Sequence, residues 1–216
     1  MATGHRGARA AAWIVAASAA SGLALQLYLL LVNAAGFNLT PLGAVARFLS
    51  FFTIFTNIAV LASAMAYALS PRGLLAHPRM LSGVTAAIIL VGIVYHVALA
   101  RLWSPAGAQW WADALLHSVT PVAATLFWLV CVPKASLRWT DPLLWALYPL
   151  AYLVYALING ALTGFYAYPF IDVSQISSAA LARNVLVLVA VFVVLGLFMV
   201  ALGRALGRFD GAAQSS

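Results

Sequence analysis

The sequence predicts an all-α integral membrane protein built as a bundle of six transmembrane helices. Hydrophobic residues make up 65% of the 216 positions and charged residues only 7%, too few to cover a soluble domain of this size. The charges also divide the chain into six apolar stretches of about 20 residues or more, enough to cross ~30 Å of hydrocarbon. We place helices near residues 11–33, 47–70, 81–102, 111–132, 143–163 and 181–203. Residues 1–208 then form one membrane domain, followed by a polar tail, 209–216, that we predict to be disordered.

The basic residues predict the orientation of this bundle. The chain has 11 lysines and arginines against 4 acidic residues, a net charge of +7. These bases lie singly or in pairs between apolar stretches, so we interpret them as topology signals and expect no nucleic-acid partner. With both termini cytoplasmic, most bases fall inside, namely Arg6, Arg9, Arg72, Arg79, Lys134, Arg138, Arg204 and Arg208. Three remain outside: Arg47, Arg101 and Arg183. This bias predicts cytoplasmic N- and C-termini.

The first apolar stretch resembles a secretory signal peptide at its beginning. Arg6 and Arg9 precede it, and it contains the small residues Ala17-Ser-Ala19. The stretch continues to Val32, which is longer than the apolar region of most signal peptides. We therefore predict a retained membrane anchor.

The second and third stretches carry polar residues near their outer ends. Ser50, Thr53 and Asn57 fall on one face of a helix over 47–70, and Thr56 borders that face. Thr53 lies six residues, or ~9 Å, below the outer boundary at Arg47. The third stretch rises toward the outside and brings Tyr95-His96 to ~7.5 Å below its own outer end.

The fourth stretch contains the two most unusual residues of the chain, Asp113 and His117. Together with Thr120 they have the spacing i, i+4 and i+7, which places all three on one face of a regular helix. Ionisable side chains are costly in hydrocarbon and usually face a protein interior or a watery cavity, so both are candidate site residues. Pro121 has no N–H for the carbonyl of His117, which predicts a kink here.

The fifth and sixth stretches add amides and a hydroxyl at the same depth: Asn159, Thr163 and Asn184. Polar groups from five helices therefore gather in the outer half of the bundle, whereas the inner halves consist almost entirely of apolar residues. This distribution predicts a shared polar pocket that opens outward.

The loop before the sixth stretch is apolar for an exposed loop. Its central residues are Tyr168, Pro169, Phe170 and Asp172. Two interpretations fit this composition equally: a lid folded over the mouth of the pocket, or a girdle of aromatic residues at the membrane interface.

Two chemistries fit the polar residues. In the first, a threonine hydroxyl attacks an acyl carbon, His117 removes its proton and Asp113 orients the imidazole, with Asn57 or Asn159 donating to the oxyanion. In the second, His96, His117 and Asp113 bind a metal such as zinc. No metal-binding signature accompanies this set, so we favour the first and expect no metal or cofactor. A purely structural role is the alternative for each threonine and asparagine, since such residues commonly cement membrane helices.

Three stretches resemble one known family. They are Phe-Thr-x-x-Thr-Asn at 52–57, Asp-x-x-x-His-x-x-x-Pro at 113–121, and Thr-Gly-x-x-x-Tyr-Pro-Phe at 163–170. Together they resemble the bacterial six-helix Pr-six-Pr membrane proteins, which are similar to the animal androgen-induced and androgen-dependent TFPI-regulating proteins. The animal members hydrolyse fatty-acid esters of hydroxy fatty acids with a threonine and a histidine. The resemblance implies that His117 is the family histidine and Thr53 the family threonine, with Thr56 and then Ser50 as alternatives.

We therefore expect a multi-pass protein of the cell inner (plasma) membrane that hydrolyses a lipid ester entering from the outer leaflet. Its partners would be membrane lipids and the apolar ester itself. The alternatives are a transporter or channel, or a membrane protein that binds a lipid or small molecule without catalysis. A transporter predicts a polar track to the cytoplasmic side, which the apolar inner halves do not offer.

Overall fold

The computed structural model describes residues 2–213 and is helical throughout, with no strand in that range. Six of the described helical segments are long and apolar enough to cross a membrane. They are Arg6–Val32, Phe52–Leu69, Pro78–Leu99, Ala108–Cys131, Asp141–Thr163 and Ser178–Leu206. The six predicted spans are thus confirmed, with boundaries that shift by a few residues. The chain has the architecture of a multi-pass membrane protein.

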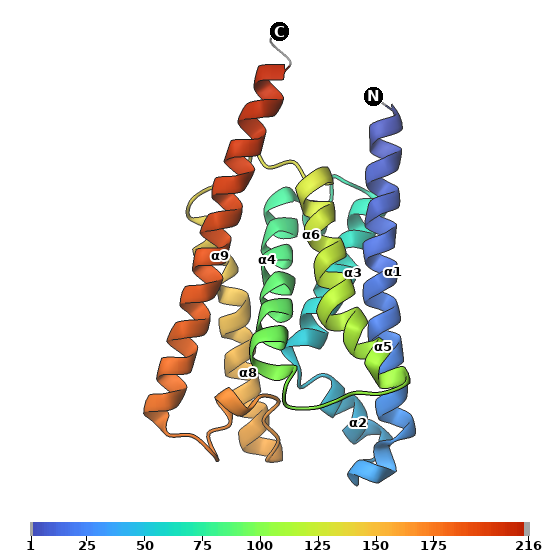
Figure 1. Ribbon diagram of the computed structural model, residues 1–216, viewed down its shortest axis with the longest axis vertical. Helices are drawn as coiled ribbons and strands as arrows, with labels where there is room; N and C mark the ends of the chain where they lie inside the picture. Colours follow the sequence, from blue (N-terminus) through green and yellow to red (C-terminus); the bar gives the residue numbers. More distant parts are fainter. Residues whose placement is uncertain (1, 214–216) are drawn as a thin grey trace.

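The bundle packs around its first, second, third and fourth spans (Figure 1). The main helices are α1 (Ala2–Val32), α2 (Pro41–Phe48), α3 (Phe52–Leu69), α4 (Pro78–Val94), α5 (Ala108–Ala114), α6 (Thr120–Cys131), α7 (Asp141–Trp145), α8 (Leu147–Thr163) and α9 (Ser178–Ala213). α1 packs along α3, α5 and α6, and α4 packs between α3, α6 and α9. The largest apolar cluster fills the space between these helices and includes Trp128, Ile88 and Phe192.

α1 begins and α9 ends at the same end of the bundle, as an even number of spans requires (Figure 1). The opposite end carries α2, the α4–α5 connection and the loop between α8 and α9. We refer to it below as the α2 end.

The second predicted span is broken near its start. α2 ends at Phe48 and α3 begins at Phe52, with Phe51 in an extended conformation (φ −100°, ψ 132°) between them. The tyrosines of α8 stabilise this break, because Tyr152 donates to the carbonyl of Ser50 at 2.7 Å and Tyr155 to that of Leu49 at 3.1 Å. These carbonyls would otherwise lack partners. The prediction of one continuous helix over 47–70 is therefore wrong at its first turn.

Two helices contain a π-helical turn at the α2 end. They are η3 (Tyr95–Leu99), which continues α4, and η4 (Leu115–Val119), which joins α5 to α6. Such wide turns are rare in general and frequent at functional sites. In η4 the cause lies in Pro121, which has no N–H and whose ring would collide with the carbonyl four residues earlier in a regular helix.

The wide turn in η4 changes which side chains share a face. Thr120 turns toward α1, where its hydroxyl donates to Ser18 Oγ at 3.2 Å. The prediction that Thr120 lies beside Asp113 and His117 is therefore wrong, because it assumed 3.6 residues per turn throughout.

The C-terminal end of the chain also differs from expectation. α9 continues to Ala213, so residues 209–213 are helical where we predicted a disordered tail. The rest of that tail, 214–216, lies outside the described residues.

Candidate functional site

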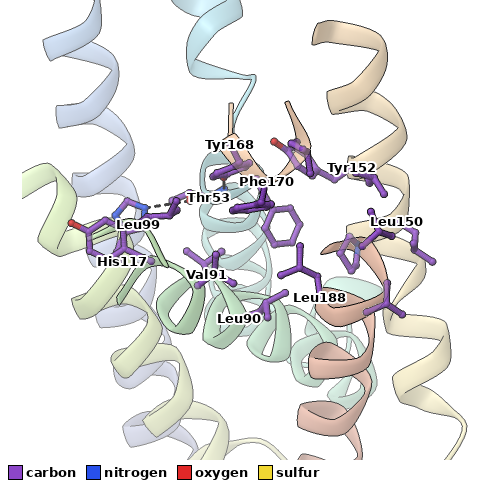
Figure 2. Close-up of a pocket in the computed structure, with 18 residues that line it drawn as sticks. Thr53, Leu90, Val91, Leu99, His117, Leu150, Tyr152, Tyr168, Phe170 and Leu188 are labelled. Carbon is purple, nitrogen blue, oxygen red and sulfur yellow. Dashed lines mark hydrogen bonds between the residues drawn. The ribbon is translucent and has the colours of Figure 1, made fainter. Parts of the chain in front are cut away.

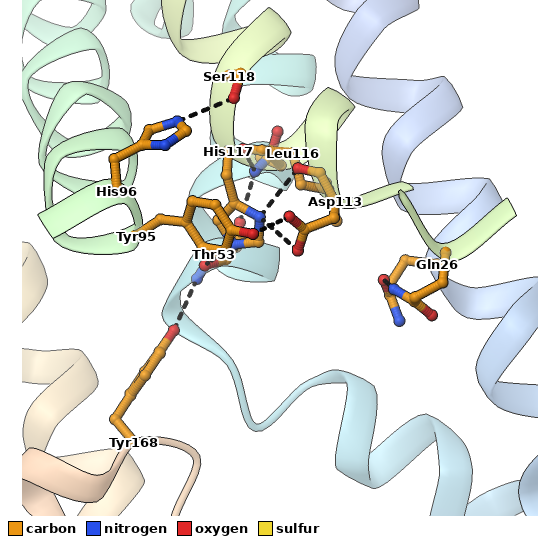
Figure 3. A network of polar contacts seen from close by, with 11 residues as sticks. Gln26, Thr53, Tyr95, His96, Asp113, Leu116, His117, Ser118 and Tyr168 are labelled. Atoms are coloured by element: carbon orange, nitrogen blue, oxygen red, sulfur yellow. Dashed lines mark hydrogen bonds and ion pairs between the residues drawn. The ribbon is translucent and has the colours of Figure 1, made fainter. Parts of the chain in front are cut away.

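The structure brings Thr53 and His117 together at the α2 end of the bundle (Figure 3). Thr53 is the second residue of α3, and His117 is the central residue of η4. The hydroxyl Oγ1 of Thr53 lies 3.3 Å from Nε2 of His117, within hydrogen-bonding distance. Thr53 is buried and His117 half-buried. The predicted pairing of this hydroxyl and this imidazole is present in the fold.

The other imidazole nitrogen of His117 faces Asp113. Nδ1 lies 3.3 Å from the carboxylate oxygen Oδ1 and 3.1 Å from the main-chain carbonyl oxygen of the same residue. Both oxygens can only accept a hydrogen bond from Nδ1–H, so both favour the tautomer in which Nε2 is free to accept from Thr53. This arrangement has the order hydroxyl, imidazole, carboxylate that defines a catalytic triad.

Tyr95 completes the support of the histidine, and the sequence did not single it out. Its ring stacks on the imidazole of His117 with centroids 4.0 Å apart and planes 16° apart. Its hydroxyl donates to Oδ2 of Asp113, which is only 6% exposed. A buried carboxylate oxygen without a hydrogen-bond donor would carry a large desolvation cost. The only sequence clue to Tyr95 is its place beside His96 at the depth of the polar pocket.

The N-terminus of α3 points into the same site. The N–H of Thr53 has no partner within its own helix, as expected in the first turn. It donates instead to the hydroxyl of Tyr168 at 3.3 Å (Figure 3). Tyr168 is buried, and burial raises the pKa of its hydroxyl, so this group remains protonated at neutral pH. The hydroxyl of Thr53, the imidazole of His117 and the main-chain N–H at the start of α3 therefore lie close together in one site.

The loop between α8 and α9 contacts this site through Tyr168, which favours the lid interpretation. Tyr168 stacks on Phe170, with centroids 5.2 Å apart, and Asn184 of α9 donates to the carbonyl of Phe170 at 2.9 Å. Pro169 and Phe170 each line one of the two cavities described below. Asp172 lines neither; its carboxylate accepts from the backbone N–H of Ser174 and closes a turn.

Two cavities meet at the Thr53–His117 pair. The larger has a volume of about 640 Å³ and lies between α1, α2, α5 and the loop; its polar lining residues are Gln26, Asn33, Arg47, Gln109 and Asp113. The smaller, of about 90 Å³, is almost wholly apolar and lies between α4, α8 and α9 (Figure 2). Thr53, Tyr95, His117 and Tyr168 line both cavities. The pair therefore lies where a polar chamber and an apolar chamber join.

Two predicted pocket residues of α3 point elsewhere. The hydroxyl of Thr56 lies 3.2 Å from that of Tyr148 on α8 and lines neither cavity. Asn57 is fully buried and uses its amide N–H groups on the carbonyls of Thr53 (2.8 Å) and Leu116 (3.3 Å). The prediction that Asn57 donates to an oxyanion is thus wrong. Its amide instead satisfies a carbonyl in the wide turn before the proline.

The predicted contributions of α8 to the pocket are also wrong. Asn159 donates to the hydroxyl of Ser50 at 3.2 Å, which places it at the break between α2 and α3. Thr163 bonds the carbonyl of Asn159 and accepts from the N–H of Phe165, so it terminates its own helix. Neither residue lines the two cavities. Their side chains point to other parts of the bundle than the pocket.

His96 is exposed and points away from His117. Its Nε2 lies 3.0 Å from the hydroxyl of Ser118. The zinc-binding set of His96, His117 and Asp113 is therefore not assembled. Within residues whose side chains are described, no three histidine, cysteine, aspartate or glutamate residues are placed to share a metal ion.

Sequence analysis missed most of the polar lining of the larger cavity. Arg47 was interpreted only as a topology signal. The side-chain amide of Gln109 on α5 donates a hydrogen bond of 2.7 Å to the amide oxygen of Gln26 on α1, and both residues line the cavity. Gln26 carried a usable signal, because a polar amide in the middle of an apolar stretch also has a desolvation cost, although a smaller one than the carboxylate of Asp113.

Fold and site together define a class: a multi-pass helical membrane protein with a threonine, a histidine and an aspartate in series inside the bundle. No protein-family model, curated protein or solved structure matches the chain.

Proposed function

We propose that this protein is an intramembrane hydrolase of fatty-acid esters, with Thr53 as nucleophile and His117 as general base. The observation that carries the proposal is the 3.3 Å contact between Thr53 Oγ1 and His117 Nε2, with Nδ1 of the same ring held by Asp113. A threonine hydroxyl is a weak nucleophile at neutral pH and needs an adjacent base. Here the base is oriented by a carboxylate, by a carbonyl and by the stacked ring of Tyr95.

The reaction follows in two steps. His117 takes the proton of Thr53 as the hydroxyl oxygen attacks the ester carbonyl; His117 then gives this proton to the departing alcohol, and the acyl group remains on Thr53. A water molecule then attacks the acyl-threonine while His117 takes its proton, and His117 returns this proton to Oγ1 of Thr53 as the fatty acid leaves. Asp113 stabilises the imidazolium that exists between these transfers.

The negative charge on the carbonyl oxygen needs a donor that is present before the reaction begins. We assign this role to the N–H of Thr53, which in this structure donates to the hydroxyl oxygen of Tyr168, and to the O–H of Tyr168. The N-terminal end of a helix also carries a partial positive charge that favours an anion. These two groups replace Asn57 and Asn159 in the proposed mechanism.

The surroundings support a lipid as the substrate. The apolar chamber is lined by Leu90, Val91, Leu150 and Leu188, which suit a hydrocarbon chain and little else (Figure 2). The bias of basic residues supports cytoplasmic termini in the plasma membrane, with the α2 end in the outer leaflet. The resemblance at 52–57, 113–121 and 163–170 to the threonine hydrolase family supports the same chemistry. The partners would then be lipids of the surrounding membrane.

A lipid-binding protein without catalysis is the second candidate, because two joined cavities are also what a binding protein requires. A transporter is less well supported. The half of the bundle nearer the termini is filled, in the described residues, by the main apolar cluster, which includes Val15, Tyr67 and Met199. A polar solute would have no path through it.

Labelling with an acylating probe for serine and threonine hydrolases tests the proposed enzymatic function. We expect wild-type protein and Thr56→Ala to react, and Thr53→Ala and His117→Ala to lose the label. Thr56 is a matched control, since it is a buried threonine on the same helix that lies outside both cavities. Equal labelling of all four proteins would remove the hydrolase proposal and leave lipid binding.

A further inference from the structure

Arg47 stands in the polar chamber as a cation without an acidic partner. It is the only lysine or arginine among the described residues that line the two cavities. Its guanidinium lies 3.6 Å from the centre of the Phe165 ring, a contact between α2 and the loop before Tyr168. It is partly buried, and burial lowers the pKa of the guanidinium, which reports the loss of hydration.

No carboxylate of the described side chains forms an ion pair with Arg47, although that of Asp113 lines the same chamber. Asp113 is bound to Tyr95 and His117, Asp141 forms an ion pair with Arg79 at the other end of α4, and Asp172 accepts from its own turn. Among the described side chains, this partly buried cation beside a chamber of about 640 Å³ has one aromatic ring as its compensating contact. An anionic ligand in the chamber would give it an ion-pair partner.

The amides of the chamber fit the same kind of ligand. Gln26 and Gln109 share one hydrogen bond, which leaves the other end of each amide available to a ligand. Asn33 lines the same chamber from the end of α1. Amides beside an arginine suit a ligand that combines an anionic oxygen with hydroxyls or ester oxygens. The lining of the smaller chamber contains no arginine and no amide side chain.

We infer that the substrate is an anionic single-chain ester, and that Arg47 binds its anionic group in the polar chamber while the acyl chain occupies the apolar chamber. This inference rests on the proposed function, because the ester bond that Thr53 attacks divides the substrate into an acyl part and an alcohol part. The anionic group is a phosphate or a carboxylate on the alcohol side of the ester. Arg47 is then a specificity-determining residue: it binds the part of the substrate that leaves with the alcohol.

Matched pairs of esters separate this role from a structural one. The first pair is 1-acyl-glycerol and 1-acyl-glycerol-3-phosphate with the same acyl chain; the second is the acyl ester of a hydroxy acid and its methyl ester. Each pair differs only in the anionic group. Hydrolysis of all four is measured with full-length protein in nanodiscs for wild type, Arg47→Gln and Arg47→Lys. Arg101→Gln is the control, because Arg101 is an exposed arginine that follows η3 at the α2 end and lines neither cavity.

We expect wild type to prefer the anionic member of at least one pair, and that pair identifies phosphate or carboxylate as the source. Arg47→Gln should lower kcat/KM for that ester about 10- to 100-fold, mainly through KM, because one charge-assisted hydrogen-bonding group is lost. The neutral ester should change less than about 2-fold. Arg47→Lys should fall between, since it keeps the charge and loses the planar fork.

Equal losses on both members of a pair would overturn the inference, because they would show that Arg47 only anchors the loop through Phe165. Equal rates of wild type on both members would overturn it as well. Binding of a non-cleavable ether analogue to Thr53→Ala, followed by the fluorescence of Trp103 in the chamber wall, separates the two proposals. Arg47-dependent binding without any hydrolysis would refute the enzyme and keep the anion site. Hydrolysis with binding that ignores Arg47 would do the reverse.

Discussion

Replacing Asp113 by asparagine tests how the histidine is held. In serine hydrolase triads the same exchange leaves the geometry intact but favours the wrong imidazole tautomer, and kcat falls about 10⁴-fold. Here the carbonyl oxygen of Asp113 lies 3.1 Å from Nδ1 of His117, slightly closer than the carboxylate oxygen at 3.3 Å. A carbonyl only accepts hydrogen bonds, and it remains in the variant. It therefore keeps the proton on Nδ1 and leaves Nε2 free for Thr53.

The decrease in kcat expected for Asp113→Asn therefore comes only from the lost electrostatic stabilisation of the imidazolium. The asparagine offers one oxygen to two donors, Tyr95 and His117, and it no longer stabilises the imidazolium. A hydrogen bond to a charged group is worth about 1.5–3 kcal/mol, which corresponds to a decrease of about 10- to 150-fold in kcat. KM should change little, because Asp113 contacts the base and not the ester.

The assay is hydrolysis of one long-chain ester by purified protein in nanodiscs, with the thermal unfolding midpoint recorded for each variant. Asp172→Asn is the matched control, an aspartate of the loop that lines neither cavity. A 10⁴-fold decrease in a folded Asp113→Asn protein would show that the carbonyl does not hold the tautomer. An unchanged kcat would show that His117 acts without the carboxylate, and the proposed triad would have to be withdrawn.

Three further predictions concern the supports of the pair. Tyr95→Phe keeps the ring stacked on His117 but removes the hydrogen-bond donor to Asp113. We expect the free energy of unfolding to fall by about 1–3 kcal/mol, measured by thermal unfolding, and kcat for ester hydrolysis to decrease less than in Asp113→Asn. Gly92→Ala would place a Cβ 3.3 Å from the carbonyl oxygen of His117, which should displace η4 and reduce hydrolase-probe labelling; labelling at the wild-type rate would contradict this. Burial raises the pKa of Tyr168 above its ordinary value near 10, so its contribution to stability is complete below pH ~10 and declines as the pH rises further; chemical denaturation of Tyr168→Phe should show a weaker alkaline decline than wild type.

The parts of this structure that follow from composition were predictable. Six apolar stretches bounded by charges gave six spans, because the thickness of a membrane fixes their length. The meeting of Thr53 and His117 was predictable for a related reason. Counted from Arg47 and Trp111, each lies six residues inside a predicted boundary, and in a regular helix this count sets the depth of a residue.

The directions of the side chains were not predictable in the same way. Assigning Thr120 and Asn159 to the pocket depends on the angle between successive residues, and this angle changes wherever the helix is not regular. The break after Phe48 and the π-turns of η3 and η4 all lie at the depth of the site. Pro121 is a local cause for η4, but the carbonyls released there and at the break are satisfied from other helices, by Asn57 of α3 and Tyr152 of α8, which no local pattern predicts.

The irregular backbone also explains why the site lies at the α2 end. A carbonyl released from a membrane helix has no water to bind in hydrocarbon, so it persists only where another polar group satisfies it or a cavity hydrates it. Tyr152 and Tyr155 do so for the break before α3, and Asn57 does so for η4. The same interruptions free the N–H of Thr53 and turn the imidazole of His117 toward it. In a continuous helix over 47–70 the N–H of Thr53 would donate to the carbonyl of Leu49 and would not be available to Tyr168.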